Sequence, residues 1–196
     1  LRNIAINQAE ILASDFNILN NNLDQLQTST NKEIEQMATT ISQISIELAK
    51  LNEQILQNSD LTLAGQPNDL LDTRDQLINE LAQYTKVNTV QDNKGVMTVI
   101  IGDGTTLVTG ITPLTLSTQA GDPDGQQSQI QLNGANTSLI LDASKLGGAL
   151  AAKFEFRDEH ISQARTELNR LSMAISSTFN DLQGQGLDLN AQQGSP

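Results

Sequence analysis

The sequence predicts an α+β fold, an elongated antiparallel bundle of long helices with a small antiparallel β module inserted in it. Three observations lead to this fold class. Residues 1–64 contain no Gly or Pro and repeat apolar residues at helical spacing. From Val87 onward the apolar period is two, and short segments alternate with turns rich in Gly and Asn. Helical spacing then returns after Asp142.

The first predicted helix carries one long apolar stripe, in which steps of three and four residues alternate. We call this set of positions the seam: Leu12, Phe16, Leu19, Leu23, Leu26, Ile34, Met37, Ile41, Ile44, Leu48, Leu51 and Ile55. An isolated helix cannot bury such a stripe, so we expect partners of comparable length and burial of Leu19 and Ile44 alike. The alternative is an ordinary core-facing stripe of a compact domain.

One irregularity interrupts the seam between Leu26 and Ile34, where two successive steps of four residues pass through Thr30. Such a stutter locally unwinds a coiled coil. Thr30 and Glu33 also have the spacing of a capping box, which would allow the helix to end and restart there. We expect one continuous or kinked helix, with a break into two helices as the alternative.

The remaining elements follow in order. A loop over residues 58–66 precedes a second helix, which is capped by Asn68 or Asp69 after Pro67 and runs to about Thr85. The short loop predicts that this helix lies antiparallel to the first. Strands are expected at residues 87–91, 96–101, 105–109, 113–118, 128–132 and 138–141. A third helix should cover 148–182 and end near Gly184.

This layout predicts two domains. A discontinuous helical rod domain comprises residues 1–85 and 146–186, and a β-rich module comprises residues 86–145. The chain starts inside a helical pattern and stops at Gly194, Ser195 and Pro196, so we expect it to be a fragment of a longer protein.

Composition excludes several classes of function. The chain has 23 acidic and 11 basic residues, a formal net charge of −12, which argues against nucleic-acid partners and anionic membranes. The absence of Cys excludes thiol catalysis, disulfides and Cys-based zinc sites within this chain. No apolar run approaches the ~18 residues that span a bilayer, and no cleavable signal peptide is visible.

The sequence offers no catalytic, cofactor-binding or metal-binding residues. His160 is the only histidine, and no Gly-x-Ser-x-Gly motif accompanies it, so we expect it to be a surface residue rather than part of a hydrolase. Residues 122–125 and 188–190 resemble fragments of calcium loops, but neither has the spaced oxygens and closing Glu of such a loop.

Two arginines, Arg74 and Arg157, lie on or near the apolar stripes of the second and third helices. One interpretation is a solvated helix face with weak local ion pairs. The other is that a bidentate guanidinium bridges packed helices or neighbouring subunits. The sequence leaves both open.

Three groups of residues carry a family resemblance. The first is 67–77 with 79–81, the second is 90–92, 99–104 and 107–110, and the third is 146–150, 156–159, Leu168, Leu171, 179–180 and 186–188. In this order and spacing they resemble the flagellar hook-associated protein 1 (FlgK) family of hook–filament junction proteins. The residues that carry the motif and form a possible interface are Asn68, Asp69, Leu70, Leu71, Asp72, Arg74, Asp75, Gly147, Gly148, Phe156, Arg157 and Asp158. Ala191 departs from the family, which more often has Gly there.

The resemblance implies a structural, non-enzymatic protein of the bacterial flagellum that serves motility, takes no cofactor and self-assembles between hook and filament. Its partners would be other copies of itself, the hook protein and the second junction protein. It would be secreted by type III export without a cleaved signal peptide and act outside the cell. The resemblance also implies polymerising terminal helices and a chaperone-binding terminal segment that this chain lacks, so we expect the isolated chain to be a monomer. The alternatives are another axial protein, such as the second junction protein or a flagellin relative, and an adhesive β module on a helical stalk.

Overall fold

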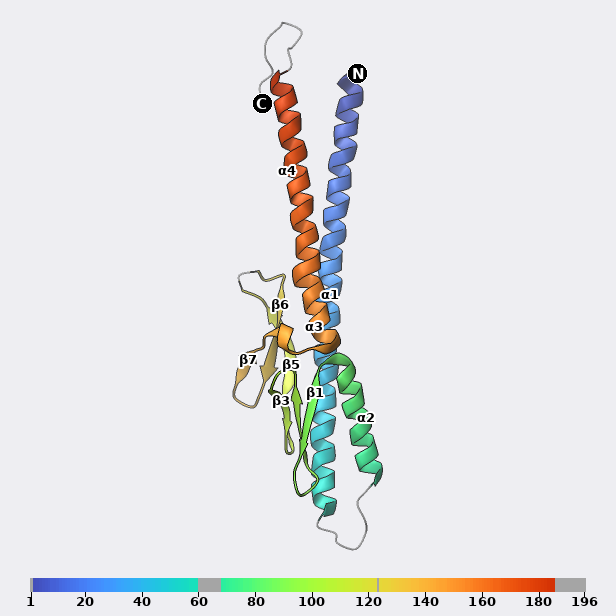
Figure 1. Ribbon diagram of the computed structural model, residues 1–196, viewed down its shortest axis with the longest axis vertical. Helices are drawn as coiled ribbons and strands as arrows, with labels where there is room; N and C mark the ends of the chain where they lie inside the picture. Colours follow the sequence, from blue (N-terminus) through green and yellow to red (C-terminus); the bar gives the residue numbers. More distant parts are fainter. Residues whose placement is uncertain (1, 60–67, 123, 186–196) are drawn as a thin grey trace. The chain divides into compact units, whose positions relative to one another are not determined.

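The computed structural model describes residues 2–59, 68–122 and 124–185 (Figure 1). The elements are α1 (Arg2–Ser59), α2 (Asn68–Tyr84), β1 (Val87–Gln91), β2 (Met97–Ile101), β3 (Thr105–Thr109), β4 (Thr112–Pro113), β5 (Thr115–Ala120), β6 (Ser128–Asn133), β7 (Ser138–Ile140), the 3-10 turn η1 (Ala143–Lys145), α3 (Gly148–Glu155), the π-helical turn η2 (Phe156–Ile161) and α4 (Ser162–Gln185). A long helix with small antiparallel sheets confirms the predicted α+β class. The predicted connection at 60–66 and the tail at 186–190 lie outside the described residues.

The chain divides into two compact units. Leu1–Gln27 with Glu159–Pro196 forms one, which we call the paired-helix unit, and Thr28–Asp158 forms the other, which we call the core unit. The predicted division into a helical rod domain and a β-rich module follows secondary structure instead, and it stays a prediction.

Helix α1 is uninterrupted from Arg2 to Ser59. The stutter at Thr30 therefore does not break it, and the alternative of two helices is wrong. Thr30 is 4% exposed and lies among helical residues on both sides, so its side chain does not cap a new helix.

The strands of the core unit form two antiparallel sheets, in the orders β1-β2-β3-β4 and β5-β6-β7. The strand expected at 113–118 is divided between them: Pro113 pairs with β3, and Thr115 begins the strand that pairs with β6. Between them, Leu114 donates its N–H to the Leu107 carbonyl at 2.8 Å. Pro113 has no N–H to donate, which suits the short edge strand β4.

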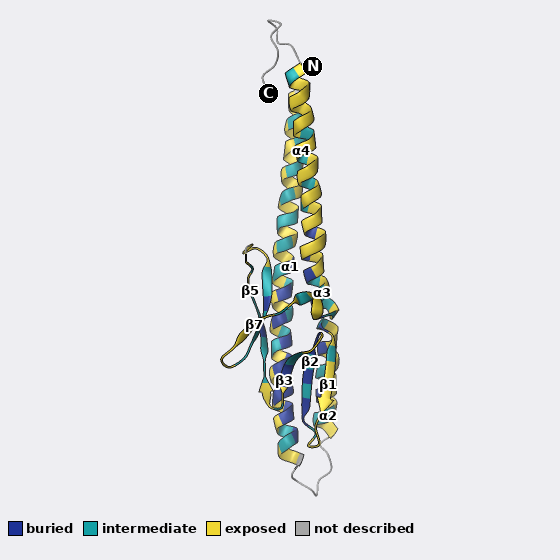
Figure 2. Ribbon diagram, turned by 60° about the vertical axis from the view of Figure 1, so that its left-hand side comes forward, coloured by how far each residue is buried: buried dark blue, intermediate teal, exposed yellow. Residues whose placement is uncertain are grey.

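One hydrophobic core holds the core unit together. It joins the seam of α1 to both sheets and to α2 and α3, and its members include Ile34, Ile41, Ile44, Leu48, Leu81, Val99, Ile101, Leu107, Ile130 and Leu150. Figure 2 shows the buried residues of α1 concentrated where the helix runs beside the strands. The partners of this half of the seam are therefore strands and short helices, not helices of comparable length as we expected.

Polar side chains of α1 reinforce this packing. Asn52 is 1% exposed, and its Nδ2 donates to the carbonyls of Met97 at 2.7 Å and Gly110 at 2.8 Å. Its Oδ1 accepts the Met97 N–H at 3.1 Å. Ser45 donates to the Leu114 carbonyl at 2.7 Å, where the chain passes from one sheet to the other. These side chains satisfy backbone groups that no strand pairs with, which fixes both sheets to the helix.

The third helix differs from its prediction. Residues 148–185 form α3, η2 and α4 in succession rather than one regular α-helix, because a π-helical turn occupies Phe156–Ile161. Apolar spacing does not reveal such a turn, since it adds one residue to a helical turn without changing residue type. No described helix is both long enough and apolar enough to cross a bilayer.

Candidate interface residues

The two halves of the seam have different environments. From Ile34 to Ile55 every seam residue is buried except Met37, which is half-buried. In the paired-helix unit Leu12, Phe16 and Leu23 are half-buried, whereas Leu19 is 50% exposed and Leu26 is 46% exposed. The expectation that Leu19 is buried is therefore wrong. A pair of helices covers only a narrow strip on each, and Leu19 lies beyond its edge.

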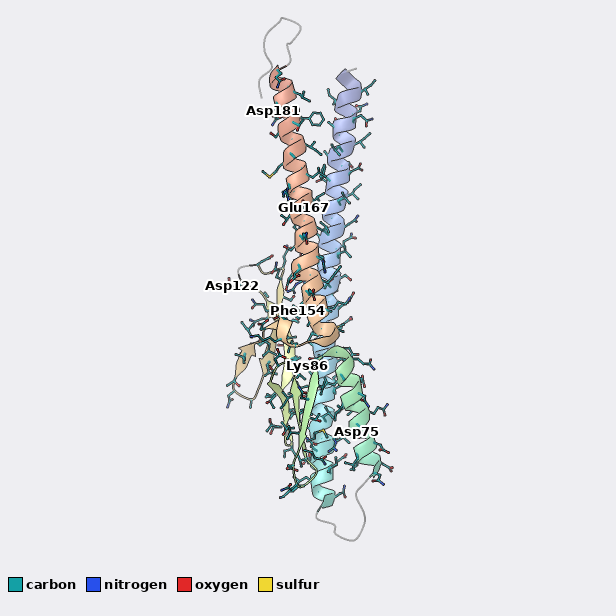
Figure 3. The ribbon with its side chains drawn as sticks, viewed as in Figure 1. Asp75, Lys86, Asp122, Phe154, Glu167 and Asp181 are labelled. Atoms are coloured by element: carbon teal, nitrogen blue, oxygen red, sulfur yellow. The ribbon has the colours of Figure 1, made fainter. Side chains whose placement is uncertain are left out.

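The motif on α2 presents charge to solvent on one side. Asn68, Asp69, Asp72 and Asp75 are exposed, and the side chain of Asp75 can be followed in Figure 3. Leu70 and Leu71 are half-buried. The solvent-facing part of the motif is acidic, because its one cation, Arg74, is directed inward.

Arg74 is 4% exposed, and its Nη1 donates to the Gly95 carbonyl at 2.7 Å. Gly95 lies in the turn between β1 and β2, so this bond fastens α2 to the first hairpin. Burial lowers the pKa of Arg74, and the neighbouring charge of Asp75 opposes that shift. The guanidinium is nonetheless a cation at any physiological pH.

Arg157 makes the densest set of contacts. Its Nη1 donates to the Asn31 side chain at 3.0 Å and to the Ser128 carbonyl at 2.7 Å. Its Nε and Nη2 donate to the two carboxylate oxygens of Asp158, at 2.7 and 3.0 Å. The guanidinium carbon lies 4.8 Å from the centre of the Phe154 ring, a cation–π distance. One side chain thus connects α1, β6 and the start of the π-helical turn.

For both arginines the interpretation as a solvated helix face is wrong. Arg74 and Arg157 are 4% and 5% exposed, and each donates to a backbone carbonyl from another element. Each guanidinium therefore bridges two parts of the same chain. The position of each Arg on an apolar stripe was the available signal, but the sequence does not identify the carbonyls.

The glycine pair of the motif permits a close approach between α3 and the end of α2. Gly148 has a φ of +64°, and a Cβ on it would lie 2.8 Å from the Thr85 Cα. Gly147 has a φ of +67°. Thr85 Oγ1 donates to the Leu146 carbonyl at 2.6 Å across this contact. Only glycine adopts these conformations without strain.

Phe156, which follows α3, is 39% exposed.

Sequence reasoning missed Asn31, Ser45 and Asn52 as packing residues. Ser45 and Asn52 follow the buried Ile41 and Leu48 by four residues, so helical geometry places them on the buried side of α1. A polar residue at such a position is a recognisable signal for a buried hydrogen bond.

The described residues contain no group of three or more His, Cys, Asp or Glu side chains suited to hold a metal ion. His160 is exposed, and so are Asp122 and Asp124 of the first calcium-like fragment; the second, at 188–190, lies outside the described residues. A hollow of about 400 Å³ lies in the paired-helix unit. It is lined by Ala9, Leu12, Ala13, Phe16, Asn17, Ser172, Ile175, Ser176, Phe179 and Asn180, none of which can titrate near neutral pH.

Comparison with known proteins gives one consistent result. The family model of the flagellar hook-associated protein FlgK helical domain matches residues 1–196. Flagellar hook-associated protein 1 of Salmonella typhimurium strain LT2 is 28% identical over 199 residues, covering 98% of this chain and 35% of that protein. The protein of the same name from Escherichia coli strain K12 is 28% identical over 203 residues, covering 98% and 36%.

A solved structure agrees. The flagellar hook junction protein FlgK from Burkholderia pseudomallei matches with a TM-score of 0.88 and 30% identity, over 98% of this chain and 35% of that one. The chain therefore spans about a third of the length of the relatives it matches. Since the family model matches the chain from end to end, the chain belongs to the family of FlgK flagellar hook-associated helical domains.

Proposed function

We propose that this chain is the helical domain of a structural protein that joins the hook of the bacterial flagellum to its filament. The observation that carries the proposal is the match of the FlgK helical-domain model to residues 1–196. The similarity in fold to the hook junction protein of Burkholderia pseudomallei supports it, with a TM-score of 0.88.

The role is mechanical, with no reaction and no cofactor. In the core unit, the buried bonds of Arg157 to Asn31 and Ser128 and those of Asn52 to Met97 resist sliding between helix and sheet. Buried, fully partnered polar groups of this kind fix one packing arrangement, because any shift would leave donors or acceptors unpaired.

The partners and location follow from the same proposal. Copies of the protein form a layer between the hook and the filament, with the hook protein on one side and the second junction protein on the other. The protein is exported through the type III apparatus without a cleaved signal peptide and acts outside the cell. An export chaperone binds a segment outside this chain.

Deletion of the gene tests the function. Cells that lack it should build hooks without filaments and release filament protein into the medium, and the intact gene should restore filaments. Immunogold labelling with antibodies against this chain should mark the hook–filament junction. Normal filaments in the deletion strain, or labelling elsewhere on the cell, would refute the proposal.

A further inference from the structure

The paired-helix unit buries little of its own apolar surface. Among its described residues, Ile161 is the one hydrophobic side chain that is buried, at 3% exposed. Its large hydrophobic residues with 46% exposure or more are Ile4, Ile6, Ile11, Ile18, Leu19, Leu26, Leu171, Met173, Phe179 and Leu182. Exposed apolar residues on this scale indicate a surface that something else covers.

Two segments of this unit carry little charge. Residues 11–23 of α1 contain one charged side chain, Asp15, and residues 171–180 of α4 contain none, in a chain whose net charge is −12. Both segments line the shared hollow, so they lie together in the unit. Depletion of charge with exposed aromatic and Met side chains is the composition of an interface centre. This neutral belt is where a second, equally acidic copy meets the least repulsion.

On α1 the exposed residues form a ridge on the side away from α4. Ile4, Ile11 and Ile18 are seven residues apart and 53–62% exposed. At about 100° per residue, they lie on the opposite side of α1 from Ala9 and Phe16, which face the hollow shared with α4. Figure 1 shows this part of α1 and α4 side by side.

On α4 the outward side is formed by Met173, which is 73% exposed, and by the small exposed residues Ala174 and Ser177. The ion pair between Arg165 and Asp24, at 2.8 Å, sets the antiparallel register of the two helices. Counting from it along both helices places the ridge residues Ile11 and Ile18 at about the same level as this outward side. The ridge of one copy can therefore meet this side of α4 in a second, parallel copy without an axial shift between the two copies.

We propose that the isoleucine ridge of one copy packs against the outward side of α4, at Met173, Ala174 and Ser177, in a second copy of the same protein. This inference rests on the proposed function as a self-assembling junction subunit. The two surfaces differ, so the contact is heterologous: it continues from copy to copy, as a ring or layer requires, instead of closing as a dimer. Since we expect the isolated chain to be a monomer, the contact forms when neighbours are already held side by side.

Cross-linking tests the contact. This chain has no cysteine, so Ile18→Cys with Met173→Cys introduces two thiols at known positions, and any cysteine elsewhere in the whole protein is changed to serine. The whole protein carrying both changes is assembled into flagella, and isolated hook–filament junctions are treated with a short bismaleimide. The expected product is a ladder of dimers, trimers and higher species on a denaturing gel. Each single variant should stay monomeric.

A matched control pair, Ile46→Cys with Gln83→Cys, places two thiols at exposed positions of the core unit, Ile46 being 50% exposed. A ladder equal to that of the test pair would show random collision and overturn the proposal. Dimers from Ile18→Cys alone would overturn it in favour of a closed, symmetric contact. Monomers alone, at junctions that assemble normally, would also overturn it while leaving the proposed function intact.

A second variant gives an independent readout. Ile11→Asp with Ile18→Asp should leave the thermal melting curve of the purified chain nearly unchanged, because both residues are exposed, yet lower the amount of the whole protein that is incorporated into the junction. Normal incorporation of this variant would overturn the proposal. Absence of the unmodified protein from the junction would instead refute the proposed function.

Discussion

Arg157 illustrates how a single charged residue connects elements far apart in the sequence. Its guanidinium has five N–H donors in a rigid plane, and the structure uses this plane to hold a helix side chain, a strand carbonyl and a carboxylate together. Asp158 is 42% exposed, so the pair keeps partial hydration and avoids the full cost of burying two charges.

We expect Arg157→Met to lower the free energy of unfolding of the core unit by about 2–4 kcal/mol. The substitution keeps much of the side-chain volume but leaves the Ser128 carbonyl and the Asn31 side chain without their donor, and a buried unpaired group costs about 1–3 kcal/mol. Urea denaturation followed by circular dichroism measures the change. Arg170→Met is the control, since Arg170 is 72% exposed and pairs with Glu167 on the same helix; it should shift stability by less than about 0.5 kcal/mol. Equal effects would mean that the Arg157 contacts contribute nothing.

Asp142 allows a test by pH. Its carboxylate accepts from the hydroxyl of Ser144 at 2.6 Å and from the Ser144 N–H at 3.1 Å. The bond from the Ser144 side chain is the main reason that the pKa of Asp142 lies below its ordinary value. The folded pKa is the lower one, so the stabilising contribution is present above the unfolded pKa and is lost as pH falls through the folded pKa.

We therefore expect Ser144→Ala to raise the pKa of Asp142 toward that of an ordinary Asp. An NMR titration of the Asp142 carboxyl carbon measures the midpoint in both proteins. Unchanged midpoints would show that the Ser144 side chain has no part in the depression.

At the scale of elements, the seam of α1 has two roles. Its second half packs into a core of strands, whereas Leu12 and Phe16 of its first half line a hollow shared with α4. Ile44 is 3% exposed and Leu19 is 50% exposed, although both occupy equivalent positions in the repeat. Periodicity identifies the side of a helix that carries apolar residues, but the depth of burial depends on how much structure covers that side.

Ile44→Asp and Leu19→Asp should therefore differ, contrary to the expectation from sequence that both destabilise strongly. We expect Ile44→Asp to cost about 4 kcal/mol or more, because it buries an unpaired charge in the core unit. Leu19→Asp should cost about 1 kcal/mol or less, since the carboxylate reaches water. Thermal melting of the two purified variants measures the difference, and matching melting temperatures would refute this account of the seam.

The elements themselves were largely predictable from the sequence, because their signals are local. The strand from Thr105 to Thr109 matches its prediction, and the sheet turns fall at Gly and Asn as expected. Two departures have physical causes without a local signal. One predicted strand is divided at Leu114, whose carbonyl accepts a hydrogen bond from Ser45 of α1, and the turn at η2 adds a residue to a helix without altering composition. The carbonyl partners of Arg74 and Arg157 were also unpredictable, since they come from other elements.

At the scale of the whole molecule, apolar burial is unequally shared. Twenty of the 21 buried hydrophobic residues among those described belong to the core unit and one, Ile161, to the paired-helix unit. The exposed apolar residues that we propose to contact a second copy therefore lie in the unit with the fewer buried apolar residues.

We expect the isolated chain to be a monomer at micromolar concentration. Its acidic charge of −12 opposes association between copies. Sedimentation velocity over a hundredfold range of concentration measures the state. Stable rings or dimers at low concentration would contradict this expectation and would mean that the exposed apolar residues bind strongly enough to overcome the repulsion between acidic copies.

The difference in apolar burial between the two units also predicts two levels of protection against hydrogen exchange. Amides in residues 11–23 and 171–180 should exchange on the order of ten times faster, or more, than those of residues 41–55. Local opening of the paired-helix unit breaks few buried contacts. Opening of the core unit, by contrast, requires its whole hydrophobic core to open. Both segments are regular α-helix, and residues 11–23 and 41–55 belong to the same helix α1, so a difference between them cannot come from secondary structure. Mass spectrometry of peptic fragments measures the rates. Uniform exchange along α1 would show that the two units unfold together. The neutral belt would then be protected against exchange as strongly as the core unit.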